Sequence, residues 1–317
     1  MSFAFTFLDG NRSPGTLLAI AAAGIFAGTI GSVAAQDLEP RRWGHLPTGS
    51  HFAGGGYLNT TGEIGLDPVL LIEDVTVEMH TYAFKYIHVF EAFERSARID
   101  LSQGYQDGTW EGLLDGSDVS TSRTGWSDTA LRFAINLLGA PPLSGEEFAA
   151  YQAGLDHETI VGVGLTAVLP TGYYLDDRLL NLGENRYTFR PQIGMVHSRG
   201  PWSFEVTGSV WIFGDNDEFW NGNHLEVDPL VSLQGHLVHT FAPGFWLGLS
   251  AGHDFGGEAT VNGIAKDDRR SLVSGAITLG VPVNRKVGLK FGYLGSRTLE
   301  DIGADLDTVF VAASVLW

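Results

Sequence analysis

Apolar and polar side chains alternate along most of the chain, and this alternation constrains the fold more than any other feature. In residues 202–214, Trp202 and Phe204 fall on one face, whereas Ser203 and Glu205 fall on the other. A period of two residues is typical of a β-strand, whose successive side chains point to opposite faces. The pattern predicts about twelve antiparallel strands in an all-β chain, at 49–60, 75–90, 96–110, 121–138, 158–170, 186–198, 202–214, 224–241, 245–257, 269–282, 286–297 and 306–317.

The connections between these segments alternate between short and long. Long connections such as 214–222 are polar and acidic, and the short ones are 91–95, 199–201, 242–244 and 283–285. Short turns on one side and long loops on the other are typical of bacterial outer-membrane barrels, whose short turns face the periplasm. The link 139–157 is the exception, because it is long on the short side. Ser144 followed by Glu146 and Glu147 predicts a short helix near 144–153, as a periplasmic cap.

The N-terminus has the features of a targeting segment. Residues 17–30 are uncharged and mostly apolar, Arg12 precedes them, and Val33-Ala34-Ala35 follows. This order predicts a secretory signal peptide at 1–35, cleaved after Ala35, and a barrel domain at 36–317. A transmembrane anchor is the alternative, but it needs a longer and more strongly apolar run. Whether the segment that follows the cleavage site folds into the barrel is left open.

A soluble antiparallel barrel would also alternate, with its apolar face turned inward. Three features favour a membrane instead. The apolar faces of the strands carry few charges, whereas the opposite faces carry many. The last strand ends on an aromatic residue with apolar residues at alternate positions, and aromatic residues gather at strand ends, as in the girdles of membrane barrels: Tyr187, Trp202, Phe241, Phe245, Trp246 and Trp317. Because lipid satisfies no exposed backbone groups, such a chain must close on itself. We therefore expect a closed transmembrane β-barrel in the outer membrane of a Gram-negative bacterium, in contact with its lipid.

In a membrane barrel, the polar faces of the strands line the lumen. The lumen and selectivity candidates are Arg98, Asp100, Asp128, Arg132, Arg190, Glu205 and Lys290. Further polar residues expected there are Gln192, Glu226, Asp228, Gln234, His236, Asp254 and Arg270. These charges either select solutes or only neutralise one another inside a narrow barrel. Trp211, Phe213, Leu230 and Phe310 also point inward, which favours amphipathic or aromatic solutes over ions.

Composition and motifs exclude several other functions. The net charge of −18 argues against nucleic acid as a partner. The chain has no cysteine, and therefore no thiolate site, and it has no nucleotide-binding fingerprint, so no cofactor is expected. Residues 215–217 begin like a calcium loop, but Phe219 and Trp220 stand where an oxygen ligand and a glycine are needed, so no metal site is expected.

One motif could carry catalysis. Residues 248–252 match G-x-S-x-G around Ser250. A nucleophile elbow of this kind needs a strand, a sharp turn and a helix, whereas these residues fall within a strand. No catalytic residue is therefore expected, and a membrane-embedded hydrolase stays the least favoured alternative.

Several longer motifs resemble one family of outer-membrane proteins. They include 46–49, 96–100, 105–108, 136–141, 181–186, 200–205, 214–219 and 266–270. Together they resemble the outer-membrane transporters of the meta-pathway phenol-degradation family, which are related in type to hydrophobic-solute uptake channels. The resemblance implies passive uptake of small aromatic or hydrophobic compounds, but it identifies no solute-binding residue. The alternative is a structural or loop-binding barrel with a plugged lumen, and the oligomeric state is left open.

Overall fold

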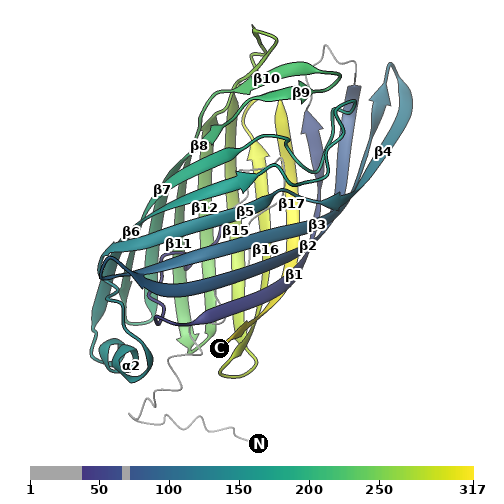
Figure 1. Ribbon diagram of the computed structural model, residues 1–317. Coiled ribbons are helices and arrows are strands. Elements are labelled where there is room, and N and C mark those ends of the chain that lie inside the picture. Colours follow the sequence, from purple (N-terminus) through teal and green to yellow (C-terminus); the bar gives the residue numbers. More distant parts are fainter. Residues whose placement is uncertain (1–37, 66–71) are drawn as a thin grey trace, which may run out of the picture.

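The computed structural model describes residues 38–65 and 72–317 and shows a closed, antiparallel β-barrel (Figure 1). The expected signal peptide at 1–35 lies outside the described residues. The ring closes because β1 pairs with β2 on one side and with the C-terminal strand, β17, on the other. This confirms the expected fold class.

Twelve strand positions make up the barrel, because β4 and β5 share one position by pairing with successive parts of β3. The first seven strands are β1 (His51–Gly65), β2 (Ile72–Ala92), β3 (Arg95–Leu114), β4 (Ser117–Trp126), β5 (Thr129–Leu138), β6 (His157–Leu169) and β7 (Thr188–Arg199). The others are β8 (Trp202–Phe213), β11 (Leu230–Ala242), β12 (Phe245–Gly256), β15 (Arg270–Pro282), β16 (Val287–Thr298) and β17 (Gly303–Leu316).

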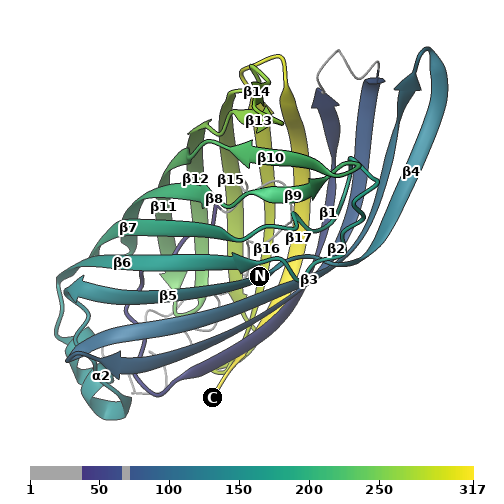
Figure 2. The same ribbon diagram turned by 45° about the horizontal axis from the view of Figure 1, so that its top comes forward.

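A second, four-stranded sheet extends from one end of the barrel, as Figure 2 shows. It contains β9 (Asn216–Phe219), β10 (Asn223–Val227), β13 (Ala259–Val261) and β14 (Ile264–Ala265). The strand expected at 224–241 is therefore wrong as a single element. Pro229 separates β10 from β11, since proline donates no hydrogen bond to a ladder. Glu226 and Asp228 are consequently exposed outside the lumen, which corrects their expected position.

The two ends of the barrel differ (Figure 1). The short-turn end carries the tight connections, the C-terminus and a helix, α2 (Gly145–Ala153). The long-loop end carries β4, the four-stranded sheet and the connection 170–187 between β6 and β7, which we call the inward loop. In the part of the chain that the structure describes, no helix has the length and apolar character to cross a membrane.

Side chains follow the alternation that the sequence predicts. On β8, Phe204 and Val206 are exposed, whereas Glu205 and Thr207 are buried inside the ring. The apolar exterior and the polar interior are the arrangement that a bilayer requires. The prediction that Trp246 belongs to the aromatic girdle is wrong, because Trp246 is 0% exposed and faces inward. The other five are exposed on the outside: Tyr187, Trp202, Phe241, Phe245 and Trp317.

Candidate functional site

The N-terminal residues of the described chain fill the lumen at the short-turn end. We call residues 38–49 the plug segment. Leu38, Glu39 and Trp43 are each 2% exposed, although none belongs to a strand. The segment joins the barrel wall at Gly49, whose backbone N–H donates to the carbonyl of Val89 over 2.8 Å. The question that the sequence left open is therefore answered: the described part of the N-terminal segment lies within the barrel.

Glu39 is the electrostatic centre of the plug segment. Its Oε2 accepts a hydrogen bond of 2.7 Å from Lys85 Nζ on β2, and its Oε1 lies 3.4 Å from Lys290 Nζ on β16. Within the plug segment, Arg42 Nη2 lies 3.6 Å from Glu39 Oε2. A buried carboxylate is stable when cations and hydrogen bonds replace water. Glu39 therefore ties the segment to two walls of the barrel, and Lys290 belongs to this cluster.

A second anchor lies on β8. Both carboxylate oxygens of Glu205 accept hydrogen bonds from the backbone N–H of Arg41, at 2.8 and 2.9 Å. The indole Nε1 of Trp43 donates to Thr207 Oγ1 over 2.9 Å. A Cβ at Gly194 would lie 2.0 Å from this Nε1, so only glycine lets the indole approach the wall there.

The remaining charged candidates form a ladder beside the plug segment. Asp100 Oδ2 accepts from Arg98 Nη2 at 2.6 Å and from Arg132 Nη1 at 3.3 Å. The guanidinium of Arg132 also lies 4.7 Å from the ring centre of Trp43, within range of a cation–π interaction. The structure thus brings Arg98, Asp100 and Arg132 together with the plug segment.

Arg190 continues the row of that ladder, because Arg132 pairs with Thr166 and Thr166 pairs with Arg190. Arg190 donates from Nε to Ser209 Oγ over 2.9 Å and stacks at 4.4 Å on Trp211. Asp128 accepts 2.8 Å hydrogen bonds from the backbone N–H groups of Gly172 and Glu184. Its contacts hold the inward loop, so a structural role accounts for its burial.

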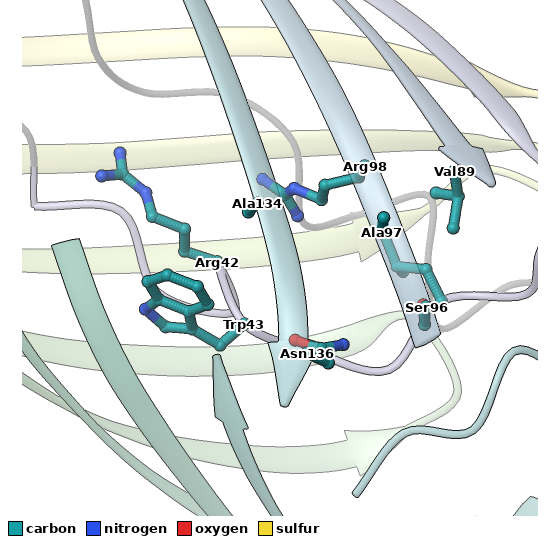
Figure 3. Close-up of a pocket in the computed structure, with 10 residues that line it drawn as sticks. Arg42, Trp43, Val89, Ser96, Ala97, Arg98, Ala134 and Asn136 are labelled. Carbon is teal, nitrogen blue, oxygen red and sulfur yellow. The ribbon is translucent and has the colours of Figure 1, made fainter. Parts of the chain in front are cut away.

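A small gap lies between part of the plug segment and the wall. A gap of about 10 Å³ lies among Trp43, Arg98, Ala134 and neighbouring residues (Figure 3). This is about the least volume that admits one water molecule. This gap, as the described residues form it, is too small for an organic solute.

A much larger cavity, about 390 Å³, lies at the long-loop end. Ligand sites in proteins are commonly about 300–1,000 Å³ and mostly apolar. The inward loop covers part of the cavity, and its Leu182 packs into the cluster that contains Trp110. Apolar lining residues include Ile64, Val77, Met79, Trp110, Leu180, Leu230, Leu272, Ile302 and Leu306. Charged lining residues are Glu184, Arg186, Asp254, Asp268 and Arg270.

Sequence reasoning missed the plug segment and the inward loop as functional elements. A signal for the first is the run Glu39-Pro40-Arg41-Arg42-Trp43, in which charged residues adjoin an aromatic soon after the expected cleavage site. For the loop, the apolar triplet 179–180 and 182 within a polar connection predicts partial burial. Neither signal shows the two-residue alternation by which the strands were predicted.

The serine of the G-x-S-x-G motif makes one side-chain contact in the structure. Ser250 Oγ lies 2.8 Å from His236 Nδ1, with both residues buried in the lumen. Ser250 nevertheless lies within β12, without the turn and helix of a nucleophile elbow. The contact is therefore accounted for as a cross-strand hydrogen bond.

The four-stranded sheet brings three possible metal ligands together. One ligand atom from each of Asp215, His224 and Glu226 lies within 4.8 Å of the others. Asp217 Oδ1 lies 2.6 Å from His224 Nδ1, and this hydrogen bond raises the pKa of His224, with its carboxylate charge adding to the effect. Exposed oxygen and nitrogen donors of this kind could bind a divalent cation weakly.

Solved bacterial outer-membrane barrels resemble this chain. An outer-membrane channel from Pseudomonas putida F1 has a TM-score of 0.72 and 20% identity, covering 89% of this chain and 100% of that chain. The translocator domain of the autotransporter NalP from Neisseria meningitidis has a TM-score of 0.48 and 13% identity, covering 86% of this chain and 90% of that one. The first likeness confirms the outer-membrane barrel fold.

No curated protein matches the chain. The closed ring, the apolar exterior and the polar lumen place the protein in the bacterial outer membrane, as expected. The model of the family described as "Putative MetA-pathway of phenol degradation" matches residues 59–298, well over half of the sequence. The chain belongs to this family, which confirms the resemblance of its motifs.

Proposed function

We propose that this protein is a passive outer-membrane channel for small aromatic or other hydrophobic compounds. The observation that carries the proposal is the apolar cavity at the long-loop end, inside the ring of strands and bordered by the inward loop. A general porin has a wide, water-filled lumen. Here an apolar chamber precedes a narrow polar region, an arrangement that favours entry of uncharged or amphipathic molecules over hydrated ions.

The plug segment sets the second requirement of the proposal. Buried side chains of the plug segment occupy part of the lumen, and the gap beside Trp43 is only about 10 Å³, so we propose that a solute reaches the short-turn end when the segment moves. Its anchors are ion pairs and hydrogen bonds rather than strand pairing. Such contacts can exchange for water, so the segment acts as a closure that opens transiently.

The selectivity role of the charged candidates follows from the same geometry. Asp100 contacts Arg98 and Arg132, and Arg132 contacts Trp43 of the plug segment. Glu205 and Lys290 bind that segment directly. We propose that these residues control how often the closure opens. Alanine at Arg132 or Arg190 should change conductance or solute preference, whereas unchanged uptake by folded variants would assign both to scaffolding.

The second candidate function is a structural or loop-binding barrel whose lumen stays shut. The observation that favours it is that the plug segment is held on three strands: Glu39 binds β2 and β16, and Arg41 and Trp43 bind β8. The two candidates differ in one respect. A channel must release the segment, whereas a structural barrel keeps it in place.

A reversible cross-link tests this difference. A Cβ at Gly248 would lie 3.7 Å from the Cβ of Pro40, within the range of about 3.5–4.5 Å for a disulfide. Since the chain has no native cysteine, Pro40→Cys with Gly248→Cys can form only this bond within a monomer. Reconstituted in liposomes, the oxidised variant should swell in benzyl alcohol or phenol no faster than protein-free liposomes do, and reduction should restore the wild-type rate.

The single variants Pro40→Cys and Gly248→Cys are the controls and should swell equally with and without reductant. Swelling by the oxidised double variant at the wild-type rate would show that solutes pass without movement of the plug segment. A folded, heat-modifiable wild-type protein that admits none of these solutes would support the structural barrel instead.

A further inference from the structure

Two arginine side chains in the large cavity have hydrogen-bonding capacity that the protein does not use. Arg186 is 7% exposed, and its Nη1 is buried without a hydrogen-bond partner. Arg270 lines the same cavity, and its side chain makes no hydrogen bond or ion pair within the described ranges 38–65 and 72–317, although the carboxylates of Glu184 and Asp268 are near enough to act on its charge. A buried donor without an acceptor costs free energy, so such groups commonly mark a place that a ligand or water completes.

The orientation of Arg186 is fixed by its neighbours. Its Nε donates to Glu184 Oε2 over 3.0 Å, and its guanidinium lies 4.6 Å from the ring centre of Phe213. These two contacts occupy one edge and one face of the guanidinium plane. The remaining donors are therefore held in place before any ligand arrives, which reduces the entropic cost of binding.

The acidic residues of the cavity must be included in its charge balance. Glu184 is engaged by Arg186, and Asp268 accepts a 2.7 Å hydrogen bond from the backbone N–H of Ala259. Asp254 is buried, at 2% exposed. Two arginines thus face three carboxylates, of which at least two already accept hydrogen bonds within the protein.

The other side of the cavity is apolar. Val77 and Met79 of β2, Trp110 of β3 and Leu306 of β17 pack with Leu182 of the inward loop. A ligand that satisfies both sides needs a compact apolar body and a terminal oxygen acceptor. Carboxylates suit arginine best, because the guanidinium fork can donate two parallel hydrogen bonds to the two oxygens.

We infer that this cavity is a recognition site for small amphipathic carboxylates, with the carboxylate at Arg186 and Arg270 and the apolar body against Trp110 and Met79. The inference rests on the proposed channel function and adds the chemical class of a solute. Within this class, a benzene ring or a short alkyl chain fits a cavity of about 390 Å³. The site would concentrate such solutes at the long-loop end before the plug segment opens.

Three probes of nearly equal size separate the contribution of charge from that of the ring: benzoate, benzyl alcohol and benzylamine. Isothermal titration into purified protein in detergent, with heats of dilution into detergent alone subtracted, measures the affinity of each. Benzoate should bind at least about tenfold more tightly than benzylamine, since a charge-assisted hydrogen bond is replaced by repulsion from arginine. Benzyl alcohol should fall between them.

Arg270→Gln is the decisive variant, because Arg270 is half-buried and its side chain makes no hydrogen bond or ion pair with another described residue. It should weaken benzoate binding about tenfold or more and leave benzyl alcohol binding within about twofold. Arg269→Gln is the matched control, since Arg269 is the exposed neighbour in sequence and does not line the cavity. It should bind all three probes as the wild type does.

Equal affinity of the wild type for benzoate and benzylamine would overturn the inference, and so would wild-type benzoate binding by folded Arg270→Gln. Liposome swelling separates this failure from failure of the channel itself. Swelling in benzyl alcohol without any preference for benzoate would refute the carboxylate site and leave the channel standing. If the protein shows no swelling and binds none of the probes, both the carboxylate site and the channel are refuted.

Discussion

Lys85 Nζ donates a 2.7 Å hydrogen bond to Glu39 Oε2, although 46 residues separate them in the chain. Glu39 belongs to the plug segment and Lys85 to β2, so this bond joins a segment without strand pairing to the barrel wall. Both side chains are less than a tenth exposed. The plug segment is therefore held chiefly by charge, and changing that charge should change how firmly the lumen is closed.

Glu39→Gln should loosen the plug segment. The substitution leaves Lys85, Lys290 and Arg42 without the carboxylate that they surround, and breaking a buried ion pair costs about 3 kcal/mol or more. We expect higher single-channel conductance and more frequent openings in a planar bilayer. Glu63→Gln, an exposed carboxylate on β1, is the control and should behave as the wild type. Unchanged openings in Glu39→Gln would show that charge does not hold the segment.

Gly194→Ala tests the fit of Trp43 against the wall. The added methyl group would lie 2.0 Å from Trp43 Nε1, so the indole must move. Overpacking of this kind costs about 1–3 kcal/mol. We expect increased channel opening and red-shifted tryptophan fluorescence, as Trp43 enters water. Gly235→Ala, where the nearest atom is 3.9 Å away, should change neither measurement.

The turn between β2 and β3 is a site for stabilisation. Phe93 and Glu94 have φ values of 53° and 57°, in the left-handed region that favours glycine. Replacing Glu94 with Gly should therefore stabilise the barrel by about 1 kcal/mol. Urea unfolding in lipid vesicles, followed by tryptophan fluorescence, measures the change. Glu91→Gly, within β2, should instead destabilise it by about 0.5–1 kcal/mol.

The pKa of His224 depends on Asp217. The hydrogen bond from the His224 ring to Asp217 raises this pKa, as does the nearby negative charge. Because the pKa is raised in the folded protein, the pair stabilises the four-stranded sheet below the ordinary pKa of histidine and ceases to do so as pH rises through the raised value. Asp217→Asn should lower the pKa of His224, measured by NMR titration with His224→Gln for assignment. Asp301→Asn should leave the titration unchanged.

Ser250→Ala addresses the hydrolase alternative. Ser250 contacts His236 inside the lumen, but it lies in a regular strand. We expect wild-type and variant proteins to hydrolyse p-nitrophenyl butyrate at the same background rate as detergent alone. Hydrolysis by the wild type that is lost in Ser250→Ala would establish catalysis by Ser250. It would also contradict the proposal that the lumen is only a passive channel.

The alternation of side chains was sufficient to predict the barrel and the direction of most lumen residues. The structure buries Asp100, Arg132, Arg190, Glu205 and Lys290, which lie on the polar faces of their strands, and Arg98 is partly buried beside Asp100. Their partners could not be predicted in this way. Glu205 binds the backbone of Arg41, and the plug segment has no periodicity from which its path could be inferred.

The four-stranded sheet was missed, although turn residues mark it. Asn221-Gly222 and Asn262-Gly263 have positive φ and form the turns of two hairpins in this sheet. Asn-Gly is among the strongest hairpin signals. The strands themselves are only two to five residues long, which is too short for alternation to be recognised. Glu226 was therefore assigned to the lumen when it belongs to this outer sheet.

The pairing of β1 with β17 has a consequence for the order of assembly. Phe52 pairs with Leu316, so the seam joins the first strand to the last, and the plug segment leads directly into that first strand. The seam can form only after the entire barrel sequence has been exported. A plug segment left outside at that moment would have to thread end-on through the short-turn mouth. The simpler route is for the plug segment to enter the lumen before β1 pairs with β17. Folding of the plug segment and closure of the barrel are therefore coupled.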